Sequence, residues 1–308
     1  MIITSIGNDN DKANTPTFTM TAKARPVIRA LLIDISGTLM IGSTPTPRAV
    51  GALAELRRTR LPFRFCSNTS KESTSAIQKR MLDAGFDVQT GESEELWTSL
   101  KAARSLIETR VLRRPYFLLS EAAEDECISA RQQDPNVPYD AVIVGLAPTH
   151  FDYDHLNTAF RILVGEHDSQ KQSHEDRKPS IPLIALHKAR FIESSGHGLM
   201  LGPGPFVAAL ENATGKEAEV LGKPSKAFFQ TVIESLDYEG PNECIAVIGD
   251  DIQTDLGGGA TDLRLWRILV KTGKYRPGDE SRDGMHPPDE VWDSFAGFVD
   301  SLLSAHDA

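Results

Sequence analysis

The side chains best suited to chemistry stand at the ends of apolar runs in the chain. They combine two carboxylates, a hydroxyl, an amide and an ammonium, namely Asp34, Asp250, Ser67, Asn68 and Lys223. A short apolar run bounded by a turn signal is typical of a buried strand, and ligands of open α/β sheets lie beyond the carboxyl ends of the strands. If these strands are neighbours in one parallel sheet, the five groups converge at one edge. Such a cluster suits Mg²⁺ and a phosphoryl group, because it offers hard oxygen ligands and hydrogen-bond donors.

Each of these residues also has a simpler explanation when it is taken alone. Asp34 and Asp250 could cap the next element, Ser67 and Asn68 could form a capping turn, and Lys223 could lie on the surface. Together these explanations require several independent coincidences, so we rank them below the functional interpretation. No G-x-G-x-x-G fingerprint follows the first strand, which argues against a dinucleotide-binding oxidoreductase.

Strand-like and helix-like runs alternate along the chain, which predicts a parallel α/β sheet with crossover connections. We expect strands over 27–35, 62–67, 116–119, 141–146, 181–186, 244–248 and 265–270. Helices are expected after a Thr46-Pro47 cap, from Ser70 to Gly85, over 94–109, near 155–164, through Val207 and Leu210, and from Ser225. The polar run 165–180 is typical of a solvated loop.

Length and charge narrow the class of protein. The 308 residues are enough for two domains, and the formal net charge of −10 disfavours nucleic acid and anionic lipid as partners. The three scattered cysteines favour free thiols in a reducing compartment. We find neither a targeting pattern at the N-terminus nor a membrane-spanning run, and therefore expect a cytoplasmic protein. Residues 1–25 are rich in Thr, Asn and Asp and are expected to form a disordered extension.

Four short motifs stand in order along the chain, and they carry a family resemblance. They are DISGT at 34–38, CSNT at 66–69, GKP at 222–224 and GDDIQTD at 249–255. Together they resemble the motifs of the haloacid dehalogenase superfamily. The resemblance implies a doubly wound, Rossmann-like parallel core with a C2-type α/β cap inserted between the second and third motifs. The expected division is core over 26–92, cap over 93–195 and core again over 196–308, with a return hinge at 202–204.

The resemblance also implies a role for each motif residue. Asp34 matches the nucleophile that forms an aspartyl-phosphate, and the expected cofactor is Mg²⁺ held by Asp34, Asp250 and the backbone carbonyl of Ser36. Lys223 matches the ammonium that orients Asp34 and stabilises transition-state charge. Phosphate contacts are assigned to Ser36, Ser67, Thr69 and Lys223, and to backbone N–H groups around Asn68. Supporting roles fall to Asp251, as a further metal partner, and to Asp255, beside either the metal or Lys223.

The chain departs from the family pattern at Ser36. Most phosphatases of this superfamily carry Asp there, which protonates the leaving oxygen and then activates water. A serine hydroxyl has no useful pKa near neutrality, and general acid–base help is typically worth about 10²–10⁴-fold. We therefore expect slow turnover of alkyl phosphates and better turnover of pyrophosphate, protonated phosphoramidates and aryl phosphates. The alternative is a weakly active or inactive phosphate-binding or regulatory protein that has retained the fold.

The cap is expected to decide the substrate. His187, Lys188 and Arg190 follow the expected strand 181–186, and Lys188 in particular would bind an anionic leaving group. An interdomain surface solvated by these residues explains them equally well. Besides a small phosphorylated substrate, the expected partner is a second copy of the chain, in a homodimer that forms through the cap.

Overall fold

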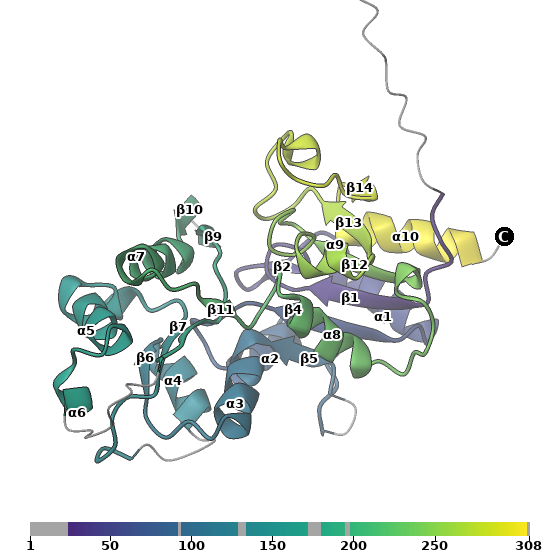
Figure 1. The fold of residues 1–308 in the computed structure, drawn as a ribbon. Coiled ribbons are helices and arrows are strands. Elements are labelled where there is room, and N and C mark those ends of the chain that lie inside the picture. Colours follow the sequence, from purple (N-terminus) through teal and green to yellow (C-terminus); the bar gives the residue numbers. More distant parts are fainter. Residues whose placement is uncertain (1–23, 92–93, 129–133, 172–179, 195–197, 307–308) are drawn as a thin grey trace, which may run out of the picture.

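The computed structural model describes residues 24–91, 94–128, 134–171, 180–194 and 198–306. Figure 1 shows two α/β parts beside each other, with the core on the right and the cap on the left. The extension expected over 1–25 lies outside the described residues up to residue 23. Its end is not free, because the Arg25 guanidinium pairs with Glu290 and lies 5.7 Å from the centre of the Trp292 ring.

Six parallel strands form the sheet of the core. They are β1 (Ala30–Asp34), β4 (Phe63–Ser67), β5 (Leu96–Thr98), β12 (Ile245–Gly249), β13 (Trp266–Val270) and β14 (Glu290–Trp292). Their order is β14-β13-β12-β1-β4-β5. All five residues of β1 are buried, as is typical of a central parallel strand that is covered on both faces. The predicted doubly wound α/β class is confirmed.

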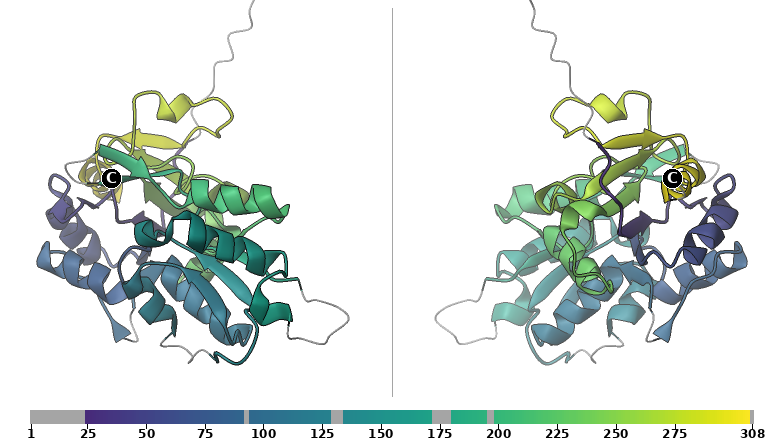
Figure 2. Two further views of the ribbon diagram at one scale, coloured as in Figure 1. Left: turned by 90° about the vertical axis from the view of Figure 1, so that its left-hand side faces the viewer. Right: turned by 90° about the vertical axis from the view of Figure 1, so that its right-hand side faces the viewer.

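Helices cover the two faces of the core sheet, as the two further views in Figure 2 show. Leu31 and Ile33 share one hydrophobic cluster with α1 (Ala49–Arg58), α2 (Thr74–Asp83) and α10 (Phe295–His306). Ala30 and Leu32 point to the opposite cluster, which includes α8 (Lys226–Glu234) and α9 (Gly259–Asp262). The alternation follows from the two-residue period of a strand. It fixes the direction of β1, and therefore the place where Asp34 emerges.

A second parallel sheet forms the cap, in the order β11-β8-β7-β6. Its strands are β6 (Pro115–Leu118), β7 (Ala141–Val144), β8 (Leu183–Ala185) and β11 (Glu219–Val220). One face packs against α3 (Ser99–Thr109) and α4 (Glu121–Ile128), and the other against α5 (Tyr153–Leu163) and α7 (Gly204–Thr214).

Short elements complete the described fold. Two antiparallel pairs are formed by β2 (Met40–Ile41) with β3 (Thr44–Pro45), and by β9 (Phe191–Ser194) with β10 (Gly198–Leu201). The remaining short helices are η2 (Pro148–His150), α6 (Asp168–Lys171), η3 (Asn242–Cys244) and η4 (Asp279–Ser281). Helix α6 interrupts the run 165–180 that we expected to be a loop, and 172–179 lie outside the described residues.

Strand pairing places the two crossings between core and cap at other positions than the limits expected for the cap, residues 93 and 195. β5 pairs with β4 in the core, so the chain enters the cap after Thr98. β11 pairs with β8 in the cap, so the chain returns to the core only after Val220. The 202–204 segment lies inside the cap rather than at the return. There Gly202 and Gly204 allow close packing, because a Cβ would lie 2.2 Å and 2.5 Å from carbonyl oxygens of Ala189 and Lys188.

Three expected helix starts are also corrected by the structure. α1 begins after Arg48, while the Thr46 hydroxyl donates a hydrogen bond to the Thr38 carbonyl instead of capping the helix. α2 begins at Thr74 with Ser73 as its cap, and Ser70 contacts the cap domain. The expected helix 94–109 includes the edge strand β5 at its start. Within the described ranges, no helix is long and apolar enough to cross a membrane.

Candidate active site

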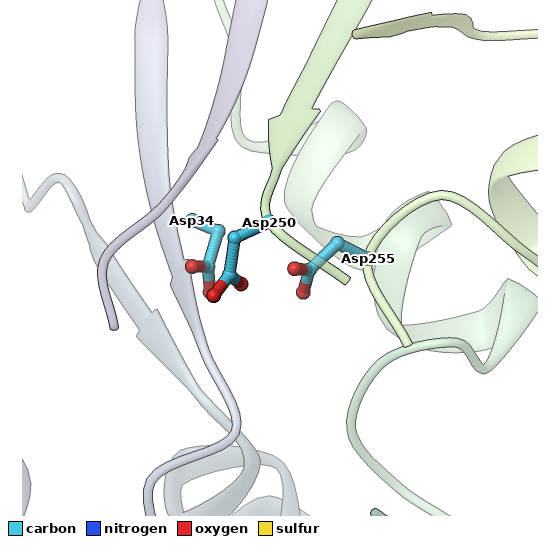
Figure 3. Close-up of side chains that lie close together, drawn as sticks. All are labelled: Asp34, Asp250 and Asp255. Carbon is cyan, nitrogen blue, oxygen red and sulfur yellow. The ribbon is translucent and has the colours of Figure 1, made fainter. Parts of the chain in front are cut away.

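Three carboxylates meet where β1 and β12 end. Ile33 pairs with Ile248, so Asp34, the last residue of β1, and Asp250, the first residue after β12, lie at the same edge of the sheet. Asp255 stands on the turn that follows, and a carboxylate oxygen of each of the three residues lies within 4.8 Å of the other two. Figure 3 shows the three side chains converging on one space. The structure thus places together the residues that the sequence predicted at one sheet edge.

Lys223 joins this cluster from the other half of the chain. Its Nζ lies 2.5 Å from Oδ1 of Asp34 and 2.8 Å from Oδ1 of Asp255. It also donates to the Cys66 carbonyl at 2.9 Å, so all three hydrogens of the ammonium have an acceptor. The Thr38 hydroxyl donates to the second oxygen of Asp34 at 3.0 Å. Asp34 is therefore held at both of its oxygens in one orientation.

The charges in this cluster are strongly coupled. Burial and the neighbouring Asp255 raise the pKa of Asp34 to about 6, because the Lys223 ammonium offsets only part of their effect. Burial opposes the charge of Lys223, but Asp255 and Asp34 outweigh it and raise the pKa of Lys223 above its ordinary value. One ammonium shared between two carboxylates explains both directions. Lys223 stays charged, while Asp34 keeps an excess of negative charge around it.

A pair of reciprocal hydrogen bonds fixes the backbone of Lys223. The Asn68 amide group donates to the Lys223 carbonyl at 2.7 Å and accepts from the Lys223 backbone N–H at 2.8 Å. A Cβ at Gly222 would lie 2.3 Å from the Asn68 side-chain oxygen, so only glycine leaves room for this approach. The Asn68 side chain therefore serves Lys223, while the phosphate contact predicted for the backbone N–H groups around Asn68 stays a prediction.

Glycines leave the space that the Asp250 carboxylate occupies. A Cβ at Gly37 would lie 1.8 Å from Oδ2 of Asp250, and a Cβ at Gly273 would lie 2.1 Å from it. The Lys274 backbone N–H donates to this oxygen at 2.7 Å. The other oxygen, Oδ1, is buried and has no hydrogen-bond partner among the described residues. Burial raises the pKa of Asp250 well above its ordinary value.

The donor set of this cluster fits a divalent cation. Asp34, Asp250, Asp251 and Asp255 face two ammonium groups, those of Lys223 and Lys274, which leaves a formal excess of two negative charges. Hard oxygen ligands of this kind suit Mg²⁺, and the free Oδ1 of Asp250 offers it a place. Asp255 is less available, since its oxygens contact the Lys223 ammonium and the Asp251 backbone N–H. This supports Lys223 as the group that Asp255 serves.

Hydroxyl groups line the other side of the space. The Ser67 hydroxyl donates to Oγ1 of Thr69 at 3.0 Å and accepts from the Thr69 backbone N–H at 3.1 Å. Ser36 is exposed and its Oγ lies 3.4 Å from the same Thr69 oxygen. These three groups face the cavity together and can rotate to donate to an anion.

The cavity at this edge has a volume of about 260 Å³ and lies between core and cap. The cap closes it with Leu146, His187, Ala189 and Ile192. The structure does not place Lys188 among the lining residues. The Lys188 ammonium instead lies 2.8 Å from both oxygens of Glu211 in α7, so the expected substrate contact is replaced by an ion pair within the cap.

His187 connects the cap to the loop that follows β4 in the core. Its Nε2 lies 3.2 Å from the Ser70 hydroxyl, and that hydroxyl accepts the Leu146 backbone N–H at 2.9 Å. The Ala189 backbone N–H donates to Nδ1 of His187 at 3.4 Å, which assigns the ring hydrogen to Nε2. Burial, with smaller effects of Lys274 and Lys223, lowers the pKa of His187 to about 3. The imidazole is therefore neutral at physiological pH.

Lys274 is one of the charged cavity-lining side chains that the sequence analysis did not identify. It lies in the loop after β13, lines the cavity, and places its Nζ 3.3 Å from Asp251. Burial opposes its charge, but Asp251 and Asp250 raise its pKa above the ordinary value. The segment ILVKTGKYRPGDE offered a signal, because it places two lysines directly beyond an apolar strand.

A buried carboxylate at the end of a central parallel strand, an ammonium paired with it and a second α/β part over the cavity are typical of hydrolases with a Rossmann-like core and a cap. Models of the haloacid dehalogenase-like hydrolase and HAD-hydrolase-like families match residues 31–131 and 220–298. The chain is 42% identical over 280 residues to haloacid dehalogenase-like hydrolase domain-containing protein 2 of Rattus norvegicus, which covers 91% of this chain and 98% of the relative. It is 35% identical over 284 residues to the human phospholysine phosphohistidine inorganic pyrophosphate phosphatase, with 91% and 93% covered.

Solved structures agree with the fold. The p-nitrophenyl phosphatase from Archaeoglobus fulgidus matches with a TM-score of 0.75 at 23% identity, over 90% of this chain and 100% of the other. A glycerol phosphate phosphatase from Mycobacterium tuberculosis, solved in complex with magnesium, matches with a TM-score of 0.69 at 25% identity, over 90% and 76%. The chain belongs to the haloacid dehalogenase-like hydrolases, and the predicted superfamily is confirmed.

Proposed function

We propose that this protein is a Mg²⁺-dependent phosphatase of small phosphorylated compounds, with Asp34 as the nucleophile. The observation that carries the proposal is the buried ion pair between Asp34 and Lys223 beside a free oxygen of Asp250. Asp34, Asp250 and the Ser36 carbonyl would hold the metal. Bound there, Mg²⁺ shields the like charges of the carboxylate and the phosphate. The magnesium complex of a glycerol phosphate phosphatase with the same fold supports this cofactor.

The residues of the chain divide the reaction between them. Lys223 and Thr38 fix the Asp34 carboxylate, which attacks phosphorus to form an aspartyl-phosphate while the bond to the leaving group breaks. Ser67 and Thr69 donate hydrogen bonds to the phosphoryl oxygens, and Lys223 stabilises the charge that develops. Water then attacks the acyl phosphate and releases inorganic phosphate. The apolar cap side chains exclude bulk water from this space.

Ser36 favours substrates whose leaving group departs without a proton from the enzyme. Its hydroxyl lines the cavity, in the slot where a carboxylate would serve as general acid. We therefore favour pyrophosphate, phosphoramidates protonated on nitrogen, and aryl phosphates as substrates. The similarity to a phospholysine phosphohistidine inorganic pyrophosphate phosphatase supports the same choice. The second candidate, a phosphate-binding protein with little turnover, rests on the same residue.

A phosphatase panel with Mg²⁺ tests the proposal. Wild type is expected to hydrolyse pyrophosphate, a phosphoramidate or p-nitrophenyl phosphate, and Asp34→Asn is expected to lower the rate at least about 10³-fold. Asp83→Asn is the matched control, because it makes the same chemical change at an exposed carboxylate in α2. Equal rates for wild type and Asp34→Asn would refute the nucleophile. Phosphate and Mg²⁺ binding without any turnover would favour the second candidate.

We also propose that the chain forms a homodimer through the cap and works in the cytoplasm. The strand β10 supports the first point, since its apolar residues Leu199, Met200 and Leu201 are 44%, 48% and 65% exposed. The three free thiols support a reducing compartment. Sedimentation of wild type and Leu201→Glu tests the dimer: the variant should sediment as a monomer, and a monomeric wild type would end this proposal.

A further inference from the structure

The mouth of the cavity carries a cation that the proposed reaction does not use. Three side chains with a positive charge line the cavity: Lys71, Arg80 and Lys274. Lys274 pairs with Asp251, and Arg80 pairs with Glu72 at 2.7 Å. Lys71 has no carboxylate within ion-pair distance among the residues that the structure describes. It is exposed, and it is therefore available to an anion that enters the cavity.

The backbone around Lys71 is held on both sides. On one side, the buried Ser70 hydroxyl contacts Nε2 of His187 and accepts the Leu146 backbone N–H. On the other side, Glu72 is anchored by Arg80, whose guanidinium also donates to the Gly42 carbonyl at 2.5 Å. The Lys71 backbone is therefore held in place, and only the rotatable bonds of its side chain remain to be fixed when the ammonium binds. This arrangement reduces the entropy that binding costs.

The buried end and the exposed end of the cavity carry opposite charges. At the floor, the formal excess of two negative charges is matched by a divalent cation, as described above. Lys71 is exposed and adds a positive charge to a cavity lining that also includes the apolar side chains of Met40, Ile41 and Ile192. A phosphate bound at the floor directs its leaving group toward this mouth, because the nucleophile Asp34 approaches from the buried side. The leaving group therefore faces the exposed Lys71 ammonium, which forms no ion pair within the described part of the chain.

We propose that Lys71 forms a subsite for a negatively charged leaving group, so that the preferred substrates carry a second anionic group next to the transferred phosphoryl group. This inference rests on the proposed phosphatase function and specifies its substrate class. The second anion is a phosphate or a carboxylate, since an ammonium binds either one. Lys71 acts on the leaving group alone, and the groups that hold the transferred phosphate lie elsewhere.

Equilibrium binding tests the subsite without requiring turnover. The ligands are orthophosphate, methylenediphosphonate and phosphonoacetate, each measured by calorimetry with saturating Mg²⁺. Lys71→Met is expected to weaken methylenediphosphonate, phosphonoacetate or both about five- to tenfold, and orthophosphate less than about twofold. The ligand that is weakened identifies the second anion as phosphate or carboxylate. Lys71→Arg should restore most of the loss.

The matched control is Lys79→Met, which removes the same charge from an exposed ion pair in α2. It should leave the affinities of all three ligands unchanged. Equal weakening of all ligands in Lys71→Met, no weakening, or a wild type that binds none of them would overturn the subsite. Kinetics add a separate reading: Lys71→Met should lower kcat/KM for pyrophosphate and spare p-nitrophenyl phosphate. A wild type that hydrolyses nothing would refute the phosphatase, while the binding result would still decide the subsite.

Discussion

The core and the cap are both parallel sheets, and both present the carboxyl ends of their strands to the same cavity. In the core, β1, β4 and β12 deliver a carboxylate, a hydroxyl and a second carboxylate: Asp34, Ser67 and Asp250. In the cap, β7 and β8 are followed by Leu146 and His187, an apolar side chain and a neutral imidazole. Parallel strands thus create two such edges, but only the core edge carries residue types that can react.

The two edges also differ in how charge is stabilised. Lys223 is 1% exposed and shares its ammonium between two buried carboxylates, where an unpaired charge costs several kcal/mol. Lys188 and Lys223 each follow a strand of the cap sheet by three residues, β8 and β11 respectively. Only Lys223 reaches the carboxylates of the core, whereas the Lys188 side chain is 35% exposed and pairs with one glutamate of the cap. Substitutions at matched positions can therefore separate the reactive edge from the covering edge.

The largest contrast is expected between these two lysines. Lys223→Met should lower turnover at least about 10³-fold and the free energy of unfolding by about 3–5 kcal/mol, because it leaves Asp34 and Asp255 buried without their cation. Lys188→Met should cost at most about 1 kcal/mol and leave turnover within about twofold. Steady-state kinetics and urea unfolding of both variants measure the difference. Similar losses of turnover would show that the cap shares in the chemistry.

A smaller but opposite effect is expected at Ser36. Ser36→Asp should raise turnover of an alkyl phosphate about 10²-fold, since it restores a group that can protonate the leaving oxygen. His187→Gln, the matched change on the cap side, should alter the same rate only a few-fold. No gain in a folded Ser36→Asp protein would contradict our account of the missing acid. A large loss in His187→Gln would assign proton transfer to the cap.

Glycine substitutions test the difference between the core edge and the cap edge by steric clash instead of by a change of charge. Gly37→Ala drives a methyl group into the Asp250 carboxylate and should weaken Mg²⁺ affinity about 10–100-fold, measured by calorimetry. Gly145→Ala in the cap meets the flexible ends of Leu119 and Leu186 at 2.8 Å. Its Mg²⁺ affinity should match that of wild type. Loss of metal binding in both variants would mean that the cap shapes the metal site.

The smallest effect concerns pH and the buried imidazole of the cap. Because the pKa of His187 is lowered to about 3 from 6.5, the unfolded chain binds more protons than the folded one between these values. The stability that this neutral ring contributes is therefore complete above pH 6.5 and falls with pH by up to about 1.4 kcal/mol per unit. Urea unfolding at pH 7.5 and pH 5 should show a steeper loss in wild type than in His187→Gln. Parallel profiles would contradict a neutral buried ring.

Much of the reactive edge was predictable, because local sequence determines it. Two runs of buried apolar residues end at Asp34 and just before Asp250. In a parallel sheet the carboxyl ends of such strands lie at one edge, so the sequence alone predicts that the two carboxylates lie there. The boundaries of the cap were not predictable in this way. The run Leu96–Thr98 joins helix α3 without a break in apolar pattern, and only pairing with β4 makes it a strand of the core.

Long-range contacts explain the remaining differences. Lys188 appeared suited to bind substrate, yet Glu211 lies 23 positions along the chain and only the packing of α7 brings it near. Ser70 was expected to begin a helix, but its hydroxyl instead contacts His187 of the cap, 117 positions away. The hydrogen bonds between the Asn68 side chain and the Lys223 backbone, which the sequence analysis did not predict, span 155 positions. None of these partners is specified by local spacing.

The reciprocal hydrogen bonds between Asn68 and Lys223 have a mechanical consequence. Lys223 follows the last strand of the cap by three residues, so it lies on the segment that connects the cap to the core. The two hydrogen bonds tie that stretch to the loop after β4 before the lysine side chain begins. A shift of the cap relative to the core would therefore act on these two hydrogen bonds before it reached the Lys223–Asp34 contact.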